Sequence, residues 1–212
     1  MRCSRPLVAW SFVVLCFPAW GSASTLDQSY APGANSGGYF VNSASPFAQT
    51  FTAGLSGQVA EIDIRVLNYF GGATAPLTLD LYSINSTYPE TLLSNLASAS
   101  ISQGSIPTTS GFVSFDLSSS GASFAAGQPY AIVLSTTSAF SYLWDGTSSG
   151  TYAGGGGRQP SGGNLYYTLA GQDFDFGFKT YVNPVPEPAS LALLGGGLVG
   201  LAWFARRKQK TR

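Results

Sequence analysis

Short segments in the middle of the chain alternate between apolar and polar residues. In residues 60–66, four apolar side chains alternate with two carboxylates and an arginine. A period of two places one set of side chains in a core and the other in solvent, as in a half-buried β-strand. The same pattern predicts strands at 77–82, 113–117, 130–135 and 174–179. The run 92–101 is ambiguous, and we predict a strand there as well.

Clusters of Gly, Pro, Asn and Ser separate these segments, as expected for turns. No segment of the middle region has a helical period. About eight to ten short strands in a region of this size predict an all-β fold, a β-sandwich. We expect this domain at 47–183, after a lead-in at 24–46, with an apolar core that needs no disulfide.

The N-terminus has the three parts of a secretory signal peptide. Arg2 and Arg5 precede an apolar run at 7–20, and small residues follow up to Ala23. We therefore predict a signal peptide at 1–23 that is removed after Ala23. Lipid attachment at Cys16 is disfavoured by the bulky Leu15 before it. A retained anchor is disfavoured because the apolar run is short for a bilayer.

The C-terminus predicts a membrane segment. A proline-rich stretch at 184–188 precedes an apolar run at 189–205, and a basic tail at 206–212 ends the chain. A helix over 189–205 would be about 25 Å long, close to the thickness of a bilayer core of about 30 Å. The basic cluster Arg206-Arg207-Lys208 would hold the tail in the cytoplasm and the domain outside. Gly196 and Gly200 favour either helix–helix contact or the ordinary abundance of glycine in such helices.

Charge and composition exclude several function classes. Charged residues make up 9% of the chain, and the net charge of zero hides basic ends. The middle has three basic residues against nine acidic ones, so we exclude nucleic-acid binding. Histidine is absent, which excludes Ser-His-Asp chemistry and histidine metal ligands. Both cysteines, Cys3 and Cys16, lie in the predicted signal peptide.

The C-terminal segment resembles a known sorting signal. The motif Pro186-Glu187-Pro188, the glycine-containing apolar run and Arg206-Arg207-Lys208 are similar in type and order to the PEP-CTERM signal of Gram-negative bacteria. The resemblance implies an exosortase, a membrane protease that cuts near Pro-Glu-Pro, as a partner. It also implies an inner-membrane intermediate and a final place on the cell surface or outside the cell, often beside exopolysaccharide.

The middle region resembles jelly-roll domains of bacterial surface proteins that carry interchangeable anchors. The residues that carry this resemblance lie at 49–54, 77–82, 111–117, 124–134 and 176–182. The resemblance implies a jelly-roll-like sandwich similar to carbohydrate-binding domains, and it supports the fold more than any activity.

Aromatic residues around a glycine-rich loop are candidates for sugar binding, because sugar rings stack on flat aromatic side chains. The candidate residues flank or lie in the loop 145–164 and are Trp144, Tyr152, Arg158, Tyr166 and Tyr167. In the alternative, Phe140, Tyr142 and Trp144 form a core-facing stripe of a strand, which leaves Tyr152 and one of Tyr166 and Tyr167 exposed.

Carboxylates suggest a weaker hypothesis, a calcium site that clips a loop. The candidates are Asp80, Asp145, Asp173 and Asp175, and the alternative is a set of solvated surface aspartates, because no Asp-x-Asp-x-Asp-Gly loop is present. Sugar hydrolysis needs two positioned carboxylates. Asp173 and Asp175 would lie about 7 Å apart on one strand face, as on any polar strand. We predict no catalytic residues and, apart from calcium, no cofactor.

Three functions follow from these observations. The first is an exported, exosortase-sorted protein of the surface or extracellular matrix, without catalysis, that binds or is embedded in exopolysaccharide. The second is an extracellular polysaccharide hydrolase. The third is a structural adhesin without a small ligand. The scarcity of charge and the lack of histidine favour the first and third.

Overall fold

The structure is a computed structural model of the whole chain. It describes residues 23–33, 37–140, 142–148, 152–167, 174–184 and 197. The described part is built from antiparallel strands, with two single-turn 3-10 helices, η1 (Tyr69–Gly71) and η2 (Gln103–Ser105). The all-β class predicted from the alternating pattern is confirmed.

Eight strands form the first sheet, in which β1, β14, β4, β10 and β13 follow one another. The strands β7 and β8 pair with β4, and β2 pairs with β10. The bounds are β1 (Thr25–Tyr30), β2 (Gly38–Val41), β4 (Gly57–Asn68), β7 (Gly111–Asp116), β8 (Ser123–Phe124), β10 (Tyr142–Thr147), β13 (Asp175–Phe176) and β14 (Phe178–Pro184). We call this the eight-stranded sheet.

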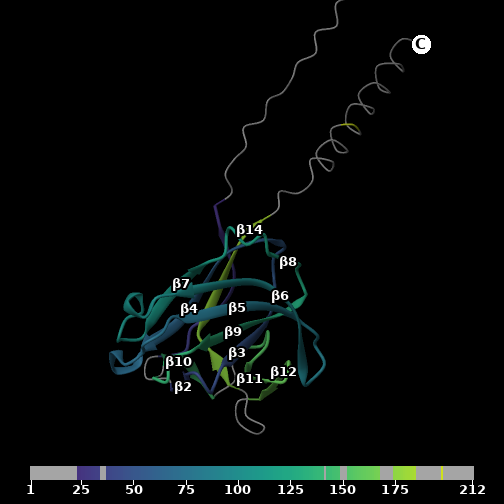
Figure 1. The fold of residues 1–212 in the computed structure, drawn as a ribbon. Helices are drawn as coiled ribbons and strands as arrows, with labels where there is room; N and C mark the ends of the chain where they lie inside the picture. The colour runs from purple at the N-terminus through teal and green to yellow at the C-terminus, as the bar shows by residue number, and fades with distance from the viewer. Residues whose placement is uncertain are drawn as a thin grey trace, which may run out of the picture.

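The other six strands close on themselves as a barrel, in the order β11, β12, β6, β5, β9 and β3. The bounds are β3 (Phe47–Thr52), β5 (Leu77–Ile84), β6 (Glu90–Ile101), β9 (Pro129–Thr136), β11 (Gly157–Ser161) and β12 (Asn164–Tyr167). In Figure 1, β5, β6 and β9 cross the centre of the view, and β11 and β12 lie below them. We call this the barrel sheet.

The main core lies between the two sheets. Leu77, Leu79 and Leu81 of β5 are fully buried and share one cluster with Ile62 and Ile64 of β4. Each such side chain stabilises the fold by about 1.5–3 kcal/mol through the apolar surface it removes from water. The alternation that predicted these strands is therefore the pattern of the core.

A second, smaller cluster lies on the other face of the barrel sheet. Its buried members are Ala48, Ile84, Ala131, Val133 and Leu165, with Tyr82 and Leu92 packed against them. These residues alternate along β3 and β9 with residues of the main core. The barrel sheet is thus apolar on both faces where β3, β9 and β12 meet.

The two ends of the described domain lie together at one edge. Thr25 of β1 is paired with Val182 of β14, and Pro184 is paired with Gly57 at the start of β4. The side chain of Asp27 joins these strands, because it accepts hydrogen bonds from Thr180 Oγ1 and from the backbone N–H of Gly54. Figure 1 shows β14 at this end and β2 and β10 toward the other.

The predicted strands are confirmed, with one break. The segment 92–101 is strand, within β6, while 174–179 divides into β13 and β14 around Gly177. The division has a clear cause, since the backbone of Gly177 donates to Asp145 O and accepts from Arg65 N, which transfers the chain from β10 to β4. The range 24–46, which we expected as a lead-in, contributes β1 and β2 to the eight-stranded sheet.

The finer parts of the predicted architecture have different outcomes. The jelly-roll arrangement is not confirmed, because the second sheet closes as a six-stranded barrel. Within the part of the chain that the structure describes, no helix has the length and apolar character needed to cross a membrane. The predicted signal peptide lies almost wholly outside the described residues, and so does the predicted helix at 189–205, apart from Gly197.

Candidate functional site

The candidate site is built on the hairpin of β11 and β12. Arg158 is paired with Tyr167, and Ser161 with Asn164, around a two-residue turn. The turn residues Gly162 and Gly163 have φ of +58° and +83°, which glycine adopts without a steric cost. The hairpin closes the barrel, because β11 pairs with β3 and β12 pairs with β6.

The glycine run at 154–157 is fixed against β3. Thr50 N donates to Gly156 O and Gly156 N donates to Thr50 Oγ1, each over 2.9 Å. A side chain at Gly155 would lie 2.0 Å from Thr50 O, so only glycine permits this approach. These glycines therefore serve close backbone contact, and this part of the predicted binding loop is held in place.

Arg158 forms a buried ion pair with Glu90 of β6. Its guanidinium donates from Nη2 to Oε1 over 2.8 Å and from Nε to Oε2 over 3.0 Å, and Nη1 donates to Gly157 O over 3.0 Å. The two residues are only 7% and 8% exposed. Because the fork is engaged by Glu90, Arg158 holds the hairpin to β6 and has little surface for a ligand.

Above this ion pair, three groups form a stack. The guanidinium carbon of Arg158 lies 4.6 Å from the centre of the Tyr167 ring. On the Tyr167 ring lies Tyr88, from the loop between β5 and β6, with centroids 4.5 Å apart and planes inclined by 25°. Tyr88 is 47% exposed. One face of Tyr88 is therefore open to solvent, and its orientation is fixed from below.

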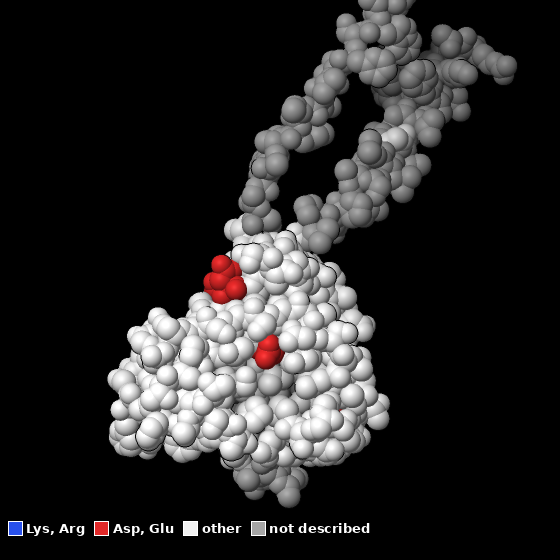
Figure 2. Space-filling model, viewed as in Figure 1, with Lys and Arg blue, Asp and Glu red and all other residues white. Residues whose placement is uncertain are grey.

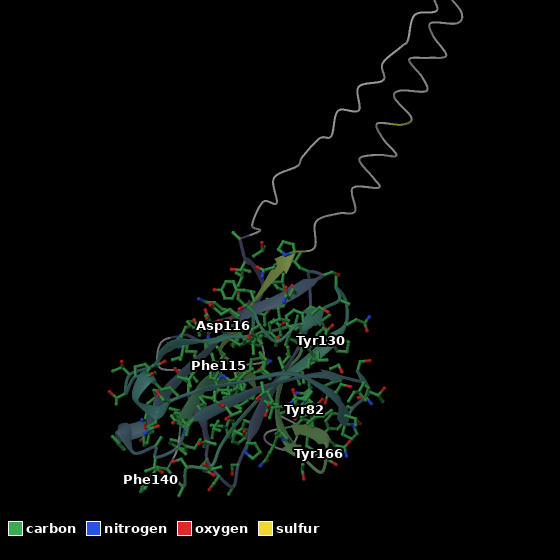
Figure 3. The ribbon with its side chains drawn as sticks, turned by 45° about the horizontal axis from the view of Figure 1, so that its top comes forward. Tyr82, Phe115, Asp116, Tyr130, Phe140 and Tyr166 are labelled. Atoms are coloured by element: carbon green, nitrogen blue, oxygen red, sulfur yellow. The ribbon has the colours of Figure 1, made fainter. Side chains whose placement is uncertain are left out.

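Tyr166 lies on the opposite face of the hairpin. It is 41% exposed, and its cross-strand partner is Gln159, which is also exposed. In Figure 3, Tyr166 and Tyr82 are labelled at the same end of the domain, away from Phe140. One exposed tyrosine thus lies at each face of the hairpin, Tyr88 of the β5–β6 loop over Tyr167 and Tyr166 of β12 beside Gln159. We call Tyr88, Tyr166 and Tyr167 the tyrosine surface.

The surroundings of the tyrosine surface are polar and carry little charge. Asn164 Oδ1 accepts from Thr91 Oγ1 over 3.1 Å, and Asn85 Oδ1 accepts from Thr91 N over 2.8 Å. Figure 2 shows a few acidic atoms and no basic ones among the described residues of the visible face. Hydroxyl and amide groups beside tyrosine rings are groups that can bind a neutral polyol.

Trp144 lies in the core and has no exposed surface. Its ring stacks on Phe176 with centroids 4.3 Å apart, and its Nε1 donates to Gly177 O over 3.1 Å. A sugar ring cannot reach Trp144, because its side chain is fully buried. The alternative interpretation, in which the strand turns these side chains toward the core, is therefore correct for Tyr142 and Trp144. Phe140, which that alternative also placed in the core, is 60% exposed.

Tyr152 joins β1 to the strands beside it. Its hydroxyl donates to Gln28 Oε1 over 3.0 Å, its backbone N–H donates to Asp175 Oδ2 over 2.9 Å, and its ring meets Phe178 edge to face. Burial raises the pKa of the Tyr152 hydroxyl, and the nearby carboxylates of Asp27 and Asp175 raise it further. The residue is a half-buried structural contact, apart from the tyrosine surface.

Three of the four aspartates proposed for calcium lie in the described part of the chain, where they form no group of three carboxylates. Asp145 is 5% exposed and accepts from Arg65 Nε over 3.2 Å and from Ser110 Oγ. Asp80 lies on the barrel sheet and accepts from Asn95 Nδ2 over 3.1 Å.

Asp175 is 1% exposed, and Asp173 lies outside the described residues. Among the residues with described positions, no group of three carboxylates could hold a metal ion. The calcium hypothesis therefore stays a prediction.

Sequence reasoning missed Tyr88. It lies in the loop 85–89, where strand periodicity ends and a period gives no information about exposure. The available signal was an aromatic residue among turn-forming polar residues, Asn85, Ser86 and Thr87, because an aromatic side chain in a short surface loop has few ways to reach a core.

Comparison with protein families identifies the C-terminal segment. Residues 184–208 match the model described as the PEP-CTERM protein-sorting motif. The match includes Pro186, Glu187, Pro188, Arg206, Arg207 and Lys208, all of which lie outside the described residues. It begins at Pro184, the last residue of β14. The predicted sorting signal is therefore confirmed, and it supports export across the membrane and processing by an exosortase.

A search among curated proteins found no match for this chain.

Proposed function

We propose that this exported, exosortase-sorted protein is a non-catalytic component of the cell surface or extracellular matrix that binds exopolysaccharide through its tyrosine surface. The observation that carries the proposal is the stack of Tyr88 on Tyr167 on Arg158. Glu90 anchors Arg158 from beneath, so the exposed face of Tyr88 is held rigidly before any ligand arrives.

Rigid aromatic surfaces favour binding, because little side-chain entropy is lost when a ligand stacks on them. Neutral hydroxyl and amide groups around the hairpin suit a polymer of neutral sugars. Tyr166 on the other face offers a second stacking position, so that one polymer chain could bend around the hairpin or two chains could be joined by it.

The ion pairs of the carboxylates favour binding without hydrolysis. Glu90 is occupied by its ion pair with Arg158, and Asp145 by Arg65. Glu61 neighbours Asp63 and Asp116 on the eight-stranded sheet, where it is paired with Tyr181 and Asp116. A general acid for sugar hydrolysis needs a partner carboxylate across a bound sugar, whereas Glu90 beside the tyrosine surface is engaged by the guanidinium of Arg158.

Cosedimentation with the polysaccharide of the producing cells tests the proposal. The exported protein is mixed with the insoluble polymer, and the bound fraction is measured for wild type, Tyr88→Ala and Tyr88→Phe. We expect Tyr88→Ala to weaken binding about tenfold, equivalent to ~1.4 kcal/mol, and Tyr88→Phe to bind nearly as wild type, because the ring supplies the stacking surface.

Leu93→Ala is the matched control, because Leu93 is an apolar residue of β6 that is 61% exposed and outside the tyrosine surface. Release of reducing ends is measured in the same samples. Binding that survives Tyr88→Ala and Tyr166→Ala together would exclude this surface. Steady release of reducing ends would replace the binding function with hydrolysis.

A further inference from the structure

A second group of exposed aromatic residues lies at the end of the eight-stranded sheet where β4 leads into η1. Phe70 is 88% exposed, Phe140 60%, Phe40 41% and Tyr69 38%. They come from β2, from η1 and from the segment before β10. We call these four residues the aromatic tip.

Three of the four rings of the aromatic tip contact one another in a row. Tyr69 lies between Phe40 and Phe70, with ring centroids 4.9 Å and 4.3 Å away and planes inclined by 71° and 53°. Phe140 packs over Gly72, where an added side-chain carbon would lie 3.4 Å from its ring. Phe140 thus lies beside the turn that carries Tyr69 and Phe70, and the inclined rings of Phe40, Tyr69 and Phe70 form a partly exposed cluster.

Phe70 is held in an unfavourable backbone conformation. Its φ is +53°, in the left-handed region, and it is the one residue other than glycine with a positive φ in the described part of the chain. That conformation costs about 1 kcal/mol or more for a residue with a side chain. Because the Phe70 ring is almost fully exposed, burial in this domain does not offset the cost.

The aromatic tip lies opposite to the edge at which the described domain begins with β1 and ends with β14. Gly57 begins β4 beside Pro184, whereas Asn68 ends β4 directly before Tyr69. Twelve residues of strand separate the two ends by about 36 Å. Figure 3 shows Phe140 at the end of the domain away from the yellow-green strand β14. The aromatic tip thus lies at the end of β4 opposite to Pro184, the residue at which the matched sorting signal begins.

From these observations we infer that the aromatic tip binds the aromatic tip of a second copy of this chain. The contact is isologous, with the same four residues on both sides, and it joins two domains whose chain ends point in opposite directions. Inclined rings suit this contact, because the edges of one cluster can meet the faces of the other, which is the preferred geometry of aromatic pairs.

The surroundings of the aromatic tip permit such a contact. The segments 38–41, 68–74, 107–110 and 137–140 contain no charged residue, so two copies meet without like-charge repulsion. The same lack of positive charge disfavours an anionic polymer or an anionic lipid surface as the partner. The rings are inclined to one another, which makes them poorer than a flat platform for stacking along a sugar chain.

The area of the contact predicts its strength. At about 200 Å² for a whole aromatic side chain, the exposed fractions leave roughly 450 Å² on each copy. Two copies together would bury roughly 900 Å², below the range of stable complexes and within that of transient ones. The contact is therefore weak between single molecules and becomes effective when many copies are arrayed on two facing surfaces.

Sedimentation velocity of the full chain in detergent tests the inference. Wild type is compared with the double variant Phe70→Asn/Phe140→Ser over a hundredfold range of concentration. Association through the C-terminal segment is common to both proteins, so a difference between them reports the aromatic tip. We expect the sedimentation coefficient of wild type to rise with concentration, and that of the variant to rise less. Leu93→Ser is the control and should behave as wild type.

Cross-linking provides a second measurement, because a disulfide traps a contact even when loss of the Phe70 ring has weakened it. In a background of Cys3→Ser and Cys16→Ser, which removes both natural cysteines, Phe70→Cys should give a disulfide-linked dimer under mild oxidation, and Leu93→Cys should not. Identical sedimentation of wild type and the double variant, or equal cross-linking at positions 70 and 93, would overturn the inference. Loss of polysaccharide or vesicle binding in the double variant, with unchanged self-association, would overturn it too.

Discussion

The aromatic residues of this domain fall into two groups that differ in packing and, we propose, in role. Trp144, Phe176 and Phe178 are fully buried between the sheets, whereas Tyr88, Tyr166 and Phe70 keep between two fifths and nine tenths of their surface in water. The buried group lies in strands, and most of the exposed group lies in loops and turns. The comparison separates residues that hold the domain together from residues that are free to meet a partner.

The exposed residues are themselves of two kinds. In the tyrosine surface, Tyr88 is supported by Tyr167, Arg158 and Glu90, so its orientation depends on a buried ion pair. In the aromatic tip, Phe70 packs against the ring of Tyr69 on a strained turn. A supported, polar-lined ring suits a sugar, and an unsupported apolar cluster suits another protein surface.

The largest effect is expected in the buried group. Trp144→Ala removes a fully buried ring from the main core and leaves a cavity. We expect a loss of about 3–5 kcal/mol in the free energy of unfolding, measured by urea denaturation. Polysaccharide binding per folded molecule should not change. A stable Trp144→Ala protein that has lost binding would reverse the assignment of roles to the two groups.

The ion pair beneath the tyrosine surface comes next. Glu90→Ala leaves the guanidinium of Arg158 buried without its carboxylate, and we expect a loss of about 3 kcal/mol. The double variant Glu90→Leu/Arg158→Met removes both charges and should recover much of that stability. It should still bind polysaccharide more weakly, because Tyr167 and Tyr88 lose the guanidinium under their stack. Wild-type binding by the double variant would show that the ion pair does not orient the tyrosines.

A smaller effect of opposite sign is expected at the aromatic tip. Phe70→Asn places at φ +53° a residue that tolerates the left-handed region. Because the Phe70 ring contributes little burial, we expect a gain of about 1 kcal/mol in the free energy of unfolding. Thermal unfolding of wild type and variant measures it. Destabilisation would mean that the Phe70 ring packs more than its exposure indicates.

The smallest expected change in stability concerns Glu61, which lies near Asp63 and Asp116 on the eight-stranded sheet. It shows how much a surface substitution alone changes the melting temperature. Partial burial, and then its contact with Asp63, raise the pKa of Glu61 above the ordinary 4.5. A carboxyl whose pKa is raised by folding stabilises the fold below 4.5 and loses that contribution as the pH rises through its raised pKa. Glu61→Gln should therefore melt about 1 °C above wild type at pH 7, with no difference at pH 3. A larger difference in melting temperature at pH 3 than at pH 7 would contradict the predicted direction of the pKa shift.

The fold class and the core could be predicted because strands impose a period. The apolar residues Ile62, Ile64, Leu79 and Leu81 were all assigned to a buried face, and all are fully buried. The division at Gly177 could not be predicted, because it depends on backbone contacts with β10 and β4, which are distant in sequence. Closure of the barrel depends in the same way on pairing of β11 with β3.

The candidate site was predicted less well than the core, for a physical reason. The sequence predicted Trp144, Tyr152 and Arg158 as ligand-binding residues because they lie near a glycine-rich loop. In the structure, Trp144 stacks on Phe176 in the core, Tyr152 hydrogen-bonds to Gln28, and Arg158 forms an ion pair with Glu90. The sequence predicted that one of Tyr166 and Tyr167 is exposed, and Tyr166 is the exposed one. The exposure of a side chain in a hairpin depends on which other strands pair with that hairpin. Those strands are distant in the sequence, so the residues around the hairpin do not reveal them.

Hydroxyl-radical footprinting of the exported protein, with and without the polysaccharide of its own cells, tests the central claim most directly, because it reports each aromatic residue separately. We predict that the polymer lowers oxidation of Tyr88 and Tyr166 severalfold, while Phe70 and Phe140 keep their rates at low protein concentration. Unchanged oxidation of Tyr88 and Tyr166 on polymer-bound protein would contradict the account, and protection confined to Phe70 and Phe140 would assign polysaccharide binding to the aromatic tip.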